Sequence, residues 1–326
     1  MTITQRIDGI TLLRPEQLRA DPPAPKSVKI ELTGRCNYRC GFCALRTRQA
    51  QPKSDMDFRL FQRVTREMRD AGVEEIGCFY LGESFMAPEL LARAIRWCKQ
   101  DLGMPYVFLT TNGSLCTPGH LRAVMSAGLD SLKFSMNAAD DEQFERVMGV
   151  KARLFSKALF NLKTARLVRS ELKSSCGIYA SSILYDGGQQ ERMREFLAEH
   201  VLPFVDEHYF LPLYSMGSLA TQREEELGYR PTAGNQGRVG ALREPLPCWS
   251  AFSEGHVTAD GILSACCFDA DTRWGMGDLN RMSFMQAWNS PEFQSLRAAH
   301  LRKDVAGTVC EACVAYQQPE QIEAAA

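Results

Sequence analysis

The sequence predicts an α/β protein in which a sheet of parallel strands precedes a smaller, cysteine-bearing domain. From residue 27 to residue 214, short β-rich runs alternate with amphipathic helical patterns. Strand and helix repeated at this spacing are typical of right-handed βαβ units. The sequence shows six such units, whereas a closed barrel of this kind has eight. We therefore expect a partial (β/α)6 barrel.

Each element is predicted from its local pattern. The predicted strands are residues 28–32, 76–81, 106–110, 131–135, 177–184 and 208–213. The segments between them carry apolar side chains at helical spacing, as at Phe58, Phe61, Val64 and Met68. These helices are expected to cover the sheet.

The pattern divides the chain into five segments. They are an N-terminal extension (1–26), the barrel (27–214), a linker or substrate loop rich in glycine and arginine (215–247), the cysteine-bearing domain (248–317) and a tail (318–326). Within the fourth segment, apolar residues predict one strong helix over residues 284–301.

Composition excludes several classes of protein. The 326 residues can bury a proper core, so cysteines are not needed as staples. The 38 basic and 39 acidic side chains balance, which argues against a nucleic-acid or membrane partner. No apolar run approaches the ~20 residues of a membrane span, and no secretion signal is present, so a cytoplasmic protein is expected. In that reducing compartment the 12 cysteines are metal ligands, catalytic thiols or buried residues.

Three cysteines stand close together after the first predicted strand. Cys36, Cys40 and Cys43 form a Cys-x3-Cys-x2-Cys pattern, and all five histidines are distant in sequence. A structural zinc site usually has four protein ligands. Three thiolates with an open position favour a metal centre that a small molecule completes.

The segment TGRCNYRCGFC, at the mouth of a partial βα barrel, resembles the cluster loop of the radical S-adenosylmethionine (SAM) enzymes. The resemblance implies that these three cysteines hold a 4Fe-4S cluster whose unique iron binds SAM. Leu81-Gly82-Glu83-Ser84 takes the place of the family's Gly-Gly-Glu motif, with leucine in place of the first glycine. The resemblance further implies SAM contacts from Gly82, Glu83, Ser84, Asn112, Ser135, Asn137 and Arg146.

A second set of cysteines lies near the end of the chain, at Cys248, Cys266, Cys310 and Cys313. Four thiolates could close a zinc or an iron–sulfur site. The segment is similar to the shortened "twitch" form of the SPASM extension of radical SAM enzymes, which implies one auxiliary 4Fe-4S cluster. The neighbouring Cys267 could be the true ligand, a hydrogen-atom donor or a buried residue. Four further cysteines are expected in the core, namely Cys78, Cys98, Cys116 and Cys176.

The resemblance implies an activity as well as cofactors. The family forms a 5′-deoxyadenosyl radical, which removes hydrogen from an unactivated C–H bond, with electrons from an external donor such as flavodoxin. A small sugar or nucleoside substrate is expected, because only 26 residues precede the first strand and leave no room for a leader-binding domain. The compact build is similar to that of cytosylglucuronate decarboxylase and 2-deoxy-scyllo-inosamine dehydrogenase, from antibiotic pathways.

Polar residues near the barrel mouth favour an acidic substrate. Lys29 and Glu31 share one face of the first strand, and His208, Tyr209 and Tyr214 are candidate acids or bases, with Cys267 as a further catalytic candidate. Arginine suits carboxylates, and arginines recur at Arg46, Arg48, Arg223, Arg230, Arg238 and Arg243.

We therefore predict a decarboxylase of a nucleoside uronate such as cytosylglucuronate. The alternatives are dehydrogenation or epimerisation of a sugar or aminocyclitol, and peptide modification with a separate leader-binding partner. A non-enzymatic metal scaffold is a further alternative, but the open three-cysteine site argues against it.

Overall fold

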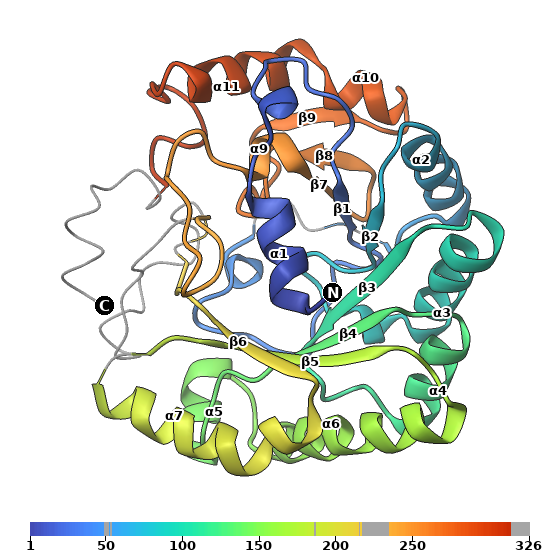
Figure 1. Ribbon diagram of the computed structural model, residues 1–326, viewed down its shortest axis with the longest axis vertical. Helices are drawn as coiled ribbons and strands as arrows, with labels where there is room; N and C mark the ends of the chain where they lie inside the picture. The colour runs from blue at the N-terminus through green and yellow to red at the C-terminus, as the bar shows by residue number, and fades with distance from the viewer. Residues whose placement is uncertain (49–51, 53, 186, 215, 217–234, 314–326) are drawn as a thin grey trace.

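A computed structural model describes residues 1–48, 52, 54–185, 187–214, 216 and 235–313. Its centre is one nine-stranded sheet in the order β6-β5-β4-β3-β2-β1-β7-β8-β9, which curves around the middle of the molecule (Figure 1). The strands of the barrel are β1 (Ser27–Ile30), β2 (Glu75–Gly77), β3 (Tyr106–Thr111), β4 (Ser131–Ser135), β5 (Gly177–Ile183) and β6 (Glu207–Leu211). All six are parallel. The α/β class and the six parallel strands are confirmed.

The predicted strands differ from the observed ones mainly at their ends. The predicted 131–135 strand matches β4, whereas β2 ends at Gly77 although the pattern extended to residue 81. The chain leaves the sheet there because the backbone of the following segment bonds to the loop after β1, with Glu83 N donating to Arg35 O at 2.9 Å. The apolar run after β2 therefore lies in a loop, where Cys78 and Leu81 are buried and Phe79 and Tyr80 are half-buried.

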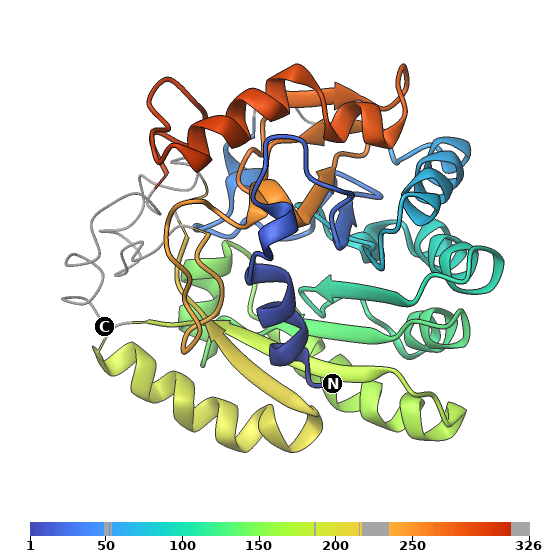
Figure 2. The same ribbon diagram turned by 45° about the horizontal axis from the view of Figure 1, so that its top comes forward.

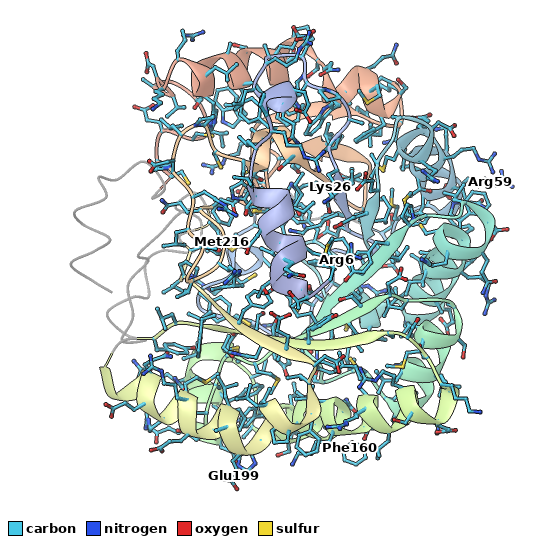
Figure 3. The ribbon with its side chains drawn as sticks, viewed as in Figure 1. Arg6, Lys26, Arg59, Phe160, Glu199 and Met216 are labelled. Carbon is cyan, nitrogen blue, oxygen red and sulfur yellow. The ribbon has the colours of Figure 1, made fainter. Side chains whose placement is uncertain are left out.

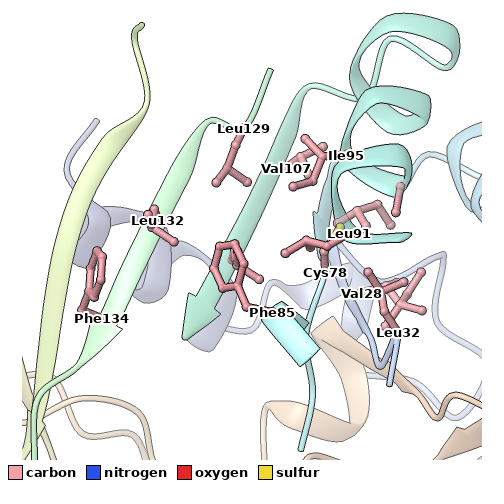
Figure 4. Packing of buried hydrophobic residues seen from close by; sticks show 14 of the residues in the cluster. Val28, Leu32, Cys78, Phe85, Leu91, Ile95, Val107, Leu129, Leu132 and Phe134 are labelled. Atoms are coloured by element: carbon pink, nitrogen blue, oxygen red, sulfur yellow. The ribbon is translucent and has the colours of Figure 1, made fainter. Parts of the chain in front are cut away.

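A layer of helices covers the outer face of the barrel sheet (Figure 2). These helices are α2 (Phe58–Asp70), α3 (Pro88–Arg96), α4 (Pro118–Ser126), α5 (Asp141–Met148), α6 (Arg153–Leu172) and α7 (Gly187–His200). Phe61, Val64 and Met68, which predicted the first of them, are fully buried on α2. Figure 4 shows the core between sheet and helices, where Val28 and Val107 pack near Leu91 and Cys78.

The four cysteines expected in the core are buried, all at 0% exposure: Cys78, Cys98, Cys116 and Cys176. Burial raises the pKa of the Cys78 thiol to about 12. These thiols therefore act as small apolar residues.

The C-terminal segment continues the barrel sheet. β7 (Glu254–Val257) pairs in parallel with β1, and β8 (Ile262–Ser264) and β9 (Gly275–Asp278) follow as antiparallel neighbours. A short helix, α9 (Ser250–Ser253), leads into β7. Main-chain hydrogen bonds thus join the barrel and the cysteine-bearing segment.

The single helix predicted over residues 284–301 is wrong. Two helices stand there, α10 (Phe284–Trp288) and α11 (Pro291–Leu301). The Ser290 side chain accepts a hydrogen bond from Phe293 N and so begins a new helix. Pro291 has no N–H to continue the previous one. Apolar residues continue at helical spacing across this break, so the sequence pattern does not reveal that the helix ends there.

The N-terminal extension contains a helix, α1 (Ile3–Thr11), that closes one end of the barrel. Ile3 N donates to Glu207 Oε2 at 2.9 Å, and Arg6 lies 3.2 Å from Glu75 and 3.6 Å from the centre of the Tyr106 ring. These three partners are the first residues of β6, β2 and β3. The helix therefore lies over the N-terminal ends of the strands, in the middle of the molecule (Figures 1 and 3).

Candidate active site

The three-cysteine loop lies at the carboxyl end of β1, between that strand and a short 3₁₀ turn (Ala44–Arg46). Its backbone is fixed against the end of α5, since Arg39 N donates to Met148 O at 3.1 Å and Gly41 N to Val147 O at 2.8 Å. The cysteine thiols are half-buried. Loop and helix together hold the three cysteines in one place.

The chemistry of these thiols fits a soft metal centre. Burial, with smaller contributions from the charges of Glu83 and Cys43, raises the pKa of Cys36 to about 12. Burial, with Cys43 and Cys36, also raises the pKa of Cys40. A bound metal would stabilise all three thiolates, which the charges of their neighbours otherwise disfavour. Within the described residues no three side chains stand in metal-ligand geometry, so the thiols must turn inward to bind a cluster.

Glu83 ties the loop after β2 to the end of β3. Its buried carboxylate accepts hydrogen bonds from Thr111 Oγ1 at 2.9 Å, Asn112 N at 2.7 Å and Phe85 N at 3.1 Å. Burial raises its pKa, and these hydrogen bonds oppose that rise. Since Glu83 also raises the pKa of Cys36, its charge acts on the cysteine loop. Its predicted role as a partner for the SAM ammonium stays a prediction.

Gly82 allows two loops to meet. A Cβ at this position would lie 1.9 Å from the carbonyl oxygen of Thr33, in the segment that leads into the cysteine loop. Only a residue without a side chain fits that approach. The glycine therefore sets the distance between the segment after β2 and the three cysteines.

An amide network connects the cysteine loop with the end of β3. Asn112 Nδ2 donates to Asn37 Oδ1 at 2.9 Å, and Asn37 Nδ2 donates to Ser114 Oγ at 2.8 Å. Asn112 also contributes a hydrogen bond that lowers the pKa of Cys36. Sequence analysis found Asn112 but missed Asn37 and Ser114. The signal for Asn37 was its place between two of the cysteines.

The remaining residues predicted to contact SAM lie at strand ends and in helical turns. Two of them form side-chain hydrogen bonds with the main chain. Ser84 Oγ donates to Cys78 O at 2.7 Å, and Asn137 Oδ1 accepts from Ile183 N at 3.0 Å. Ser135 ends β4 half-buried, and Arg146 is exposed on α5. Their roles toward SAM stay predictions.

A cavity of about 210 Å³ occupies the barrel interior. Ile3, Ile7 and Ile10 of α1 line it at one end, and Tyr214, Asn235, Cys267 and Phe268 line it elsewhere. Charged or polar groups of the strands also face it, among them Lys29, Lys133, Tyr209 and Glu254. The cavity is thus mostly apolar, with a few convergent polar groups, as small-molecule sites are.

Lys29 and Glu254 join the two halves of the sheet inside this cavity. Lys29 Nζ lies 2.8 Å from Glu254 Oε2, and His256 Nε2 lies 3.0 Å from the same oxygen. Burial alone would raise the pKa of Glu254, but Lys29 and His256 lower it to about 2. Burial likewise lowers the pKa of Lys29, yet Glu254 raises it overall. Both groups are therefore charged, and each satisfies the other.

Lys133 has a different environment. Its Nζ bonds to the hydroxyl of Tyr209 at 2.9 Å. Burial, and then repulsion from Lys29, lowers its pKa to about 7, although Glu254 opposes this. Glu254 already binds Lys29 and His256. Among the described residues, Lys133 is thus a cavity-lining amine without an acidic partner of its own.

Two candidate catalytic residues do not face the cavity. Glu31 pairs with Arg48 at 3.0 Å, and both side chains are at most 1% exposed. His208 bonds to Ser182 Oγ at 2.9 Å and stacks edge-on with Phe210, on the face of β6 opposite Tyr209. Burial lowers the pKa of His208 to about 4, so it is neutral. Neither side chain is among the described residues that line this cavity, and the catalytic roles predicted for Glu31 and His208 stay predictions.

The other candidates lie at the cavity wall. Tyr214 lines it and donates to Gly237 O at 2.7 Å, and burial raises its pKa. The Cys267 thiol accepts a hydrogen bond from Asn235 Nδ2 at 3.2 Å. Cys267 is thus a cavity residue and not a plain core residue.

The arginines that favoured an acidic substrate serve the fold. Arg238 forms a double hydrogen bond with Asp8 of α1, at 3.0 and 2.7 Å, and Arg243 Nε donates to Thr11 Oγ1 at 3.1 Å. Arg46 Nη2 donates to Gly41 O at 3.3 Å. Arg223 and Arg230 lie outside the described residues. These arginines therefore no longer support an acidic substrate. The residue that supports it is Lys133, which sequence analysis missed.

The second set of cysteines also converges. Cys248 precedes α9, Cys266 follows β8, and Cys310 and Cys313 follow α11. Burial raises the pKa of Cys248, and Cys310 and Cys313 add to the rise. Burial also raises the pKa of Cys266, and the neighbouring Cys267, Cys310 and Cys248 contribute to this rise. Four soft thiols with this mutual effect fit an iron–sulfur cluster.

Comparison with known families decides the class of the chain. Residues 30–180 match the radical SAM superfamily, and residues 248–314 match an iron–sulfur cluster-binding domain, SPASM. The chain carries a radical SAM domain followed by a SPASM domain. These domains imply SAM and 4Fe-4S clusters as the cofactors.

Two curated relatives show how far the likeness extends. The chain is 34% identical over 112 residues to the S-adenosylmethionine-dependent nucleotide dehydratase RSAD2 of Danio rerio, a match that covers 34% of this chain and 30% of the relative. It is 25% identical over 282 residues to the GTP 3′,8-cyclase of Synechococcus sp., which covers 74% of this chain and 79% of the relative.

Solved structures share the fold of the radical SAM and SPASM domains. BtrN in complex with AdoMet and 2-DOIA superposes with a TM-score of 0.58 at 14% identity, over 88% of this chain and 92% of BtrN. SuiB of Streptococcus suis, bound to its precursor peptide SuiA, superposes with a TM-score of 0.65 at 13% identity, over 90% of this chain and 70% of SuiB. Within the described residues no helix is long and apolar enough to cross a membrane.

Proposed function

We propose that the chain is a radical SAM decarboxylase of a small sugar acid or nucleoside uronate such as cytosylglucuronate, whose carboxylate binds Lys133. The observation that carries this proposal is the Lys133 amine in the cavity. It bonds to the Tyr209 hydroxyl at 2.9 Å and has no acidic partner of its own among the described residues. A buried amine is costly unless it is paired or neutral. A substrate carboxylate would supply the missing negative charge and raise the pKa of the amine.

The size of the cavity supports a small substrate. The cavity of about 210 Å³ is many times the roughly 10–15 Å³ that holds one water. Such a volume suits a small molecule, and the apolar walls from α1 fit the unreactive face of that molecule. The substrate carboxylate would lie where Lys133 and Tyr209 meet.

The chain's own residues would have distinct tasks. Cys36, Cys40 and Cys43 would hold one cluster, with SAM on its open iron, and the bound pair supplies an organic radical that removes a hydrogen atom. Lys133 and Tyr209 would hold the carboxylate and a proton. The isoleucines of α1 would keep water from the cavity.

The net reaction depends on where the abstracted hydrogen goes. One C–C bond breaks to release carbon dioxide, and if the hydrogen returns from 5′-deoxyadenosine to the product, one proton is consumed with no net redox change. If 5′-deoxyadenosine is released, two protons and two electrons are consumed, one electron to cleave SAM and one to complete the product. The neutral Tyr209 hydroxyl and the Lys133 ammonium are the proton donors in reach of the cavity. Single electrons would come from an external donor such as flavodoxin.

Three other outcomes are alternatives to decarboxylation. The Cys267 thiol at the cavity wall could return a hydrogen atom, which would give an epimer, and transfer of an electron to an auxiliary cluster would give a dehydrogenase. The fold likeness to SuiB, solved with a precursor peptide, favours a peptide whose acidic side chain enters the cavity. In each case the substrate group enters the same cavity.

The test is an anaerobic reaction of reconstituted protein with SAM, dithionite and a cytosylglucuronate-type uronate, followed by mass spectrometry. We expect 5′-deoxyadenosine formation and a substrate mass lower by carbon dioxide. A loss of two hydrogens assigns a dehydrogenase, and unchanged mass with exchange of solvent deuterium assigns an epimerase. Conversion of an acidic peptide but not of uronates would replace the small-substrate proposal with peptide modification.

A further inference from the structure

His300 lies between two cysteines of the second set. It comes from α11 and is fully buried. Its Nδ1 lies 3.1 Å from the backbone nitrogen of Cys248, and its Nε2 lies 3.3 Å from Cys310 Sγ. A single imidazole therefore contacts the first cysteine of the set and one of the last pair.

These contacts fix where the ring carries its hydrogen. The Cys248 backbone N–H can only donate, so His300 Nδ1 must present its lone pair. The ring hydrogen then lies on Nε2. Because Nε2 faces Cys310, the ring donates an N–H···S hydrogen bond to that sulfur.

The surroundings make this hydrogen bond strong. His300 is 0% exposed, and the Phe252 ring stands nearly perpendicular to it at 6.1 Å. A hydrogen bond in such an apolar environment is stronger than one exposed to water. The Cys248 backbone N–H holds the opposite edge of the His300 ring through Nδ1. The ring therefore cannot turn without losing both hydrogen bonds.

We infer that His300 is a positioning residue that holds Cys310 and raises the reduction potential of the auxiliary cluster bound by the second cysteine set. Hydrogen bonds to the sulfur ligands of a cluster favour its reduced, more negative state. This inference rests on the cluster content that the SPASM domain implies and is independent of the substrate.

The test compares His300→Leu and His300→Gln with the wild type in the reconstituted protein. Leucine removes both hydrogen bonds, whereas glutamine can accept from Cys248 N–H and donate to Cys310. In an anaerobic redox titration followed by electron paramagnetic resonance, we expect a more negative auxiliary-cluster potential in His300→Leu and a near-normal one in His300→Gln. The potential of the first cluster stays constant in both variants.

The matched control is His120→Leu. His120 bonds through Nδ1 to the carbonyl of Leu115, at the start of α4, and neither cysteine set contacts it in the described structure. Its loss tests for a general effect of removing a partly buried histidine. Both potentials should stay at their wild-type values.

Full iron content with an unchanged potential in His300→Leu overturns the inference. If His300→Leu loses the auxiliary cluster, pulsed paramagnetic resonance on wild type with ring-labelled nitrogen-15 histidine decides. A nitrogen coupling to the reduced auxiliary cluster that disappears in His300→Gln supports the inference, and no coupling in the wild type overturns it.

Discussion

Lys133 is the residue on which the substrate proposal depends, and replacing it separates binding from folding. Lys133→Met keeps the length of the side chain and removes the amine. A hydrogen bond to a charged group contributes about 1.5–3 kcal/mol, so we expect kcat/KM for a uronate to fall about 10- to 100-fold. The exposed Lys157 of α6 gives the matched control Lys157→Met. Equal kinetics in the two variants would contradict the role of Lys133.

The same residue predicts a dependence of stability on pH. Its pKa is about 7 in the folded chain, against the usual lysine value of 10.5 in the unfolded chain. Between these values the unfolded chain binds a proton that the folded chain does not, so this contribution to stability rises with pH from about 7 to about 10.5. The slope is at most about 1.4 kcal/mol per pH unit, and partial exposure of the side chain reduces it.

Urea unfolding of wild type and Lys133→Met at pH 7 and pH 9 measures this effect. We expect the stability of the wild type relative to the variant to increase between the two pH values. A constant difference would mean that Lys133 remains charged in the folded chain. Thiol and tyrosine titrations occur in both proteins and cancel in the comparison.

At the scale of the elements, Gly82 controls how the segment after β2 meets the cysteine loop. In Gly82→Ala the Cβ would collide with Thr33 O, so we expect the segment to move and the first cluster to be lost. Iron analysis should show loss of about four of the roughly eight irons expected for two clusters. Gly188→Ala is the control, because a Cβ there meets nothing within 4 Å. Full iron content in Gly82→Ala would show that the close approach is unimportant.

The helix α1 depends on the pairing of Asp8 with Arg238. Removing this double hydrogen bond with Asp8→Ala should lower the free energy of unfolding by about 1–3 kcal/mol and speed hydrogen exchange across residues 3–11. Glu16→Ala removes only an exposed ion pair with Arg14 and is expected to change little. Identical exchange in both variants would mean that the other contacts of α1, among them Ile3 N with Glu207 and Arg6 with Glu75, are enough to hold the helix.

The strands and both cysteine sets could be predicted from the sequence, because alternation, helical spacing and cysteine spacing are local signals. β4 was predicted at its observed bounds, whereas the break at Ser290 was hidden by continuous apolar spacing. Lys133 was missed although it alternates in β4 much as Lys29 does in β1. The pairs Arg48–Glu31 and Arg238–Asp8 join distant segments, and no local pattern indicates which arginine meets which carboxylate.

At the scale of the whole molecule, the ion pair of Lys29 and Glu254 connects the barrel with the C-terminal domain across the β1–β7 pairing. Glu254→Leu leaves a buried lysine without its counter-ion, which typically costs about 3–5 kcal/mol. The double variant Lys29→Met with Glu254→Leu removes both charges and should regain most of that stability. Thermal unfolding of the three proteins measures the coupling, and additive losses would contradict it.

Because α1 covers the N-terminal ends of the strands, it closes that end of the cavity in the described part of the barrel. A molecule that reaches Lys133 from the end that carries the cysteine loop leaves by the same way, since α1 covers the other end. Whatever binds over that end closes the path for anything deeper. Kinetically, this geometry predicts compulsory ordered addition, with the substrate first and SAM second, and product inhibition that is competitive only with the first reactant.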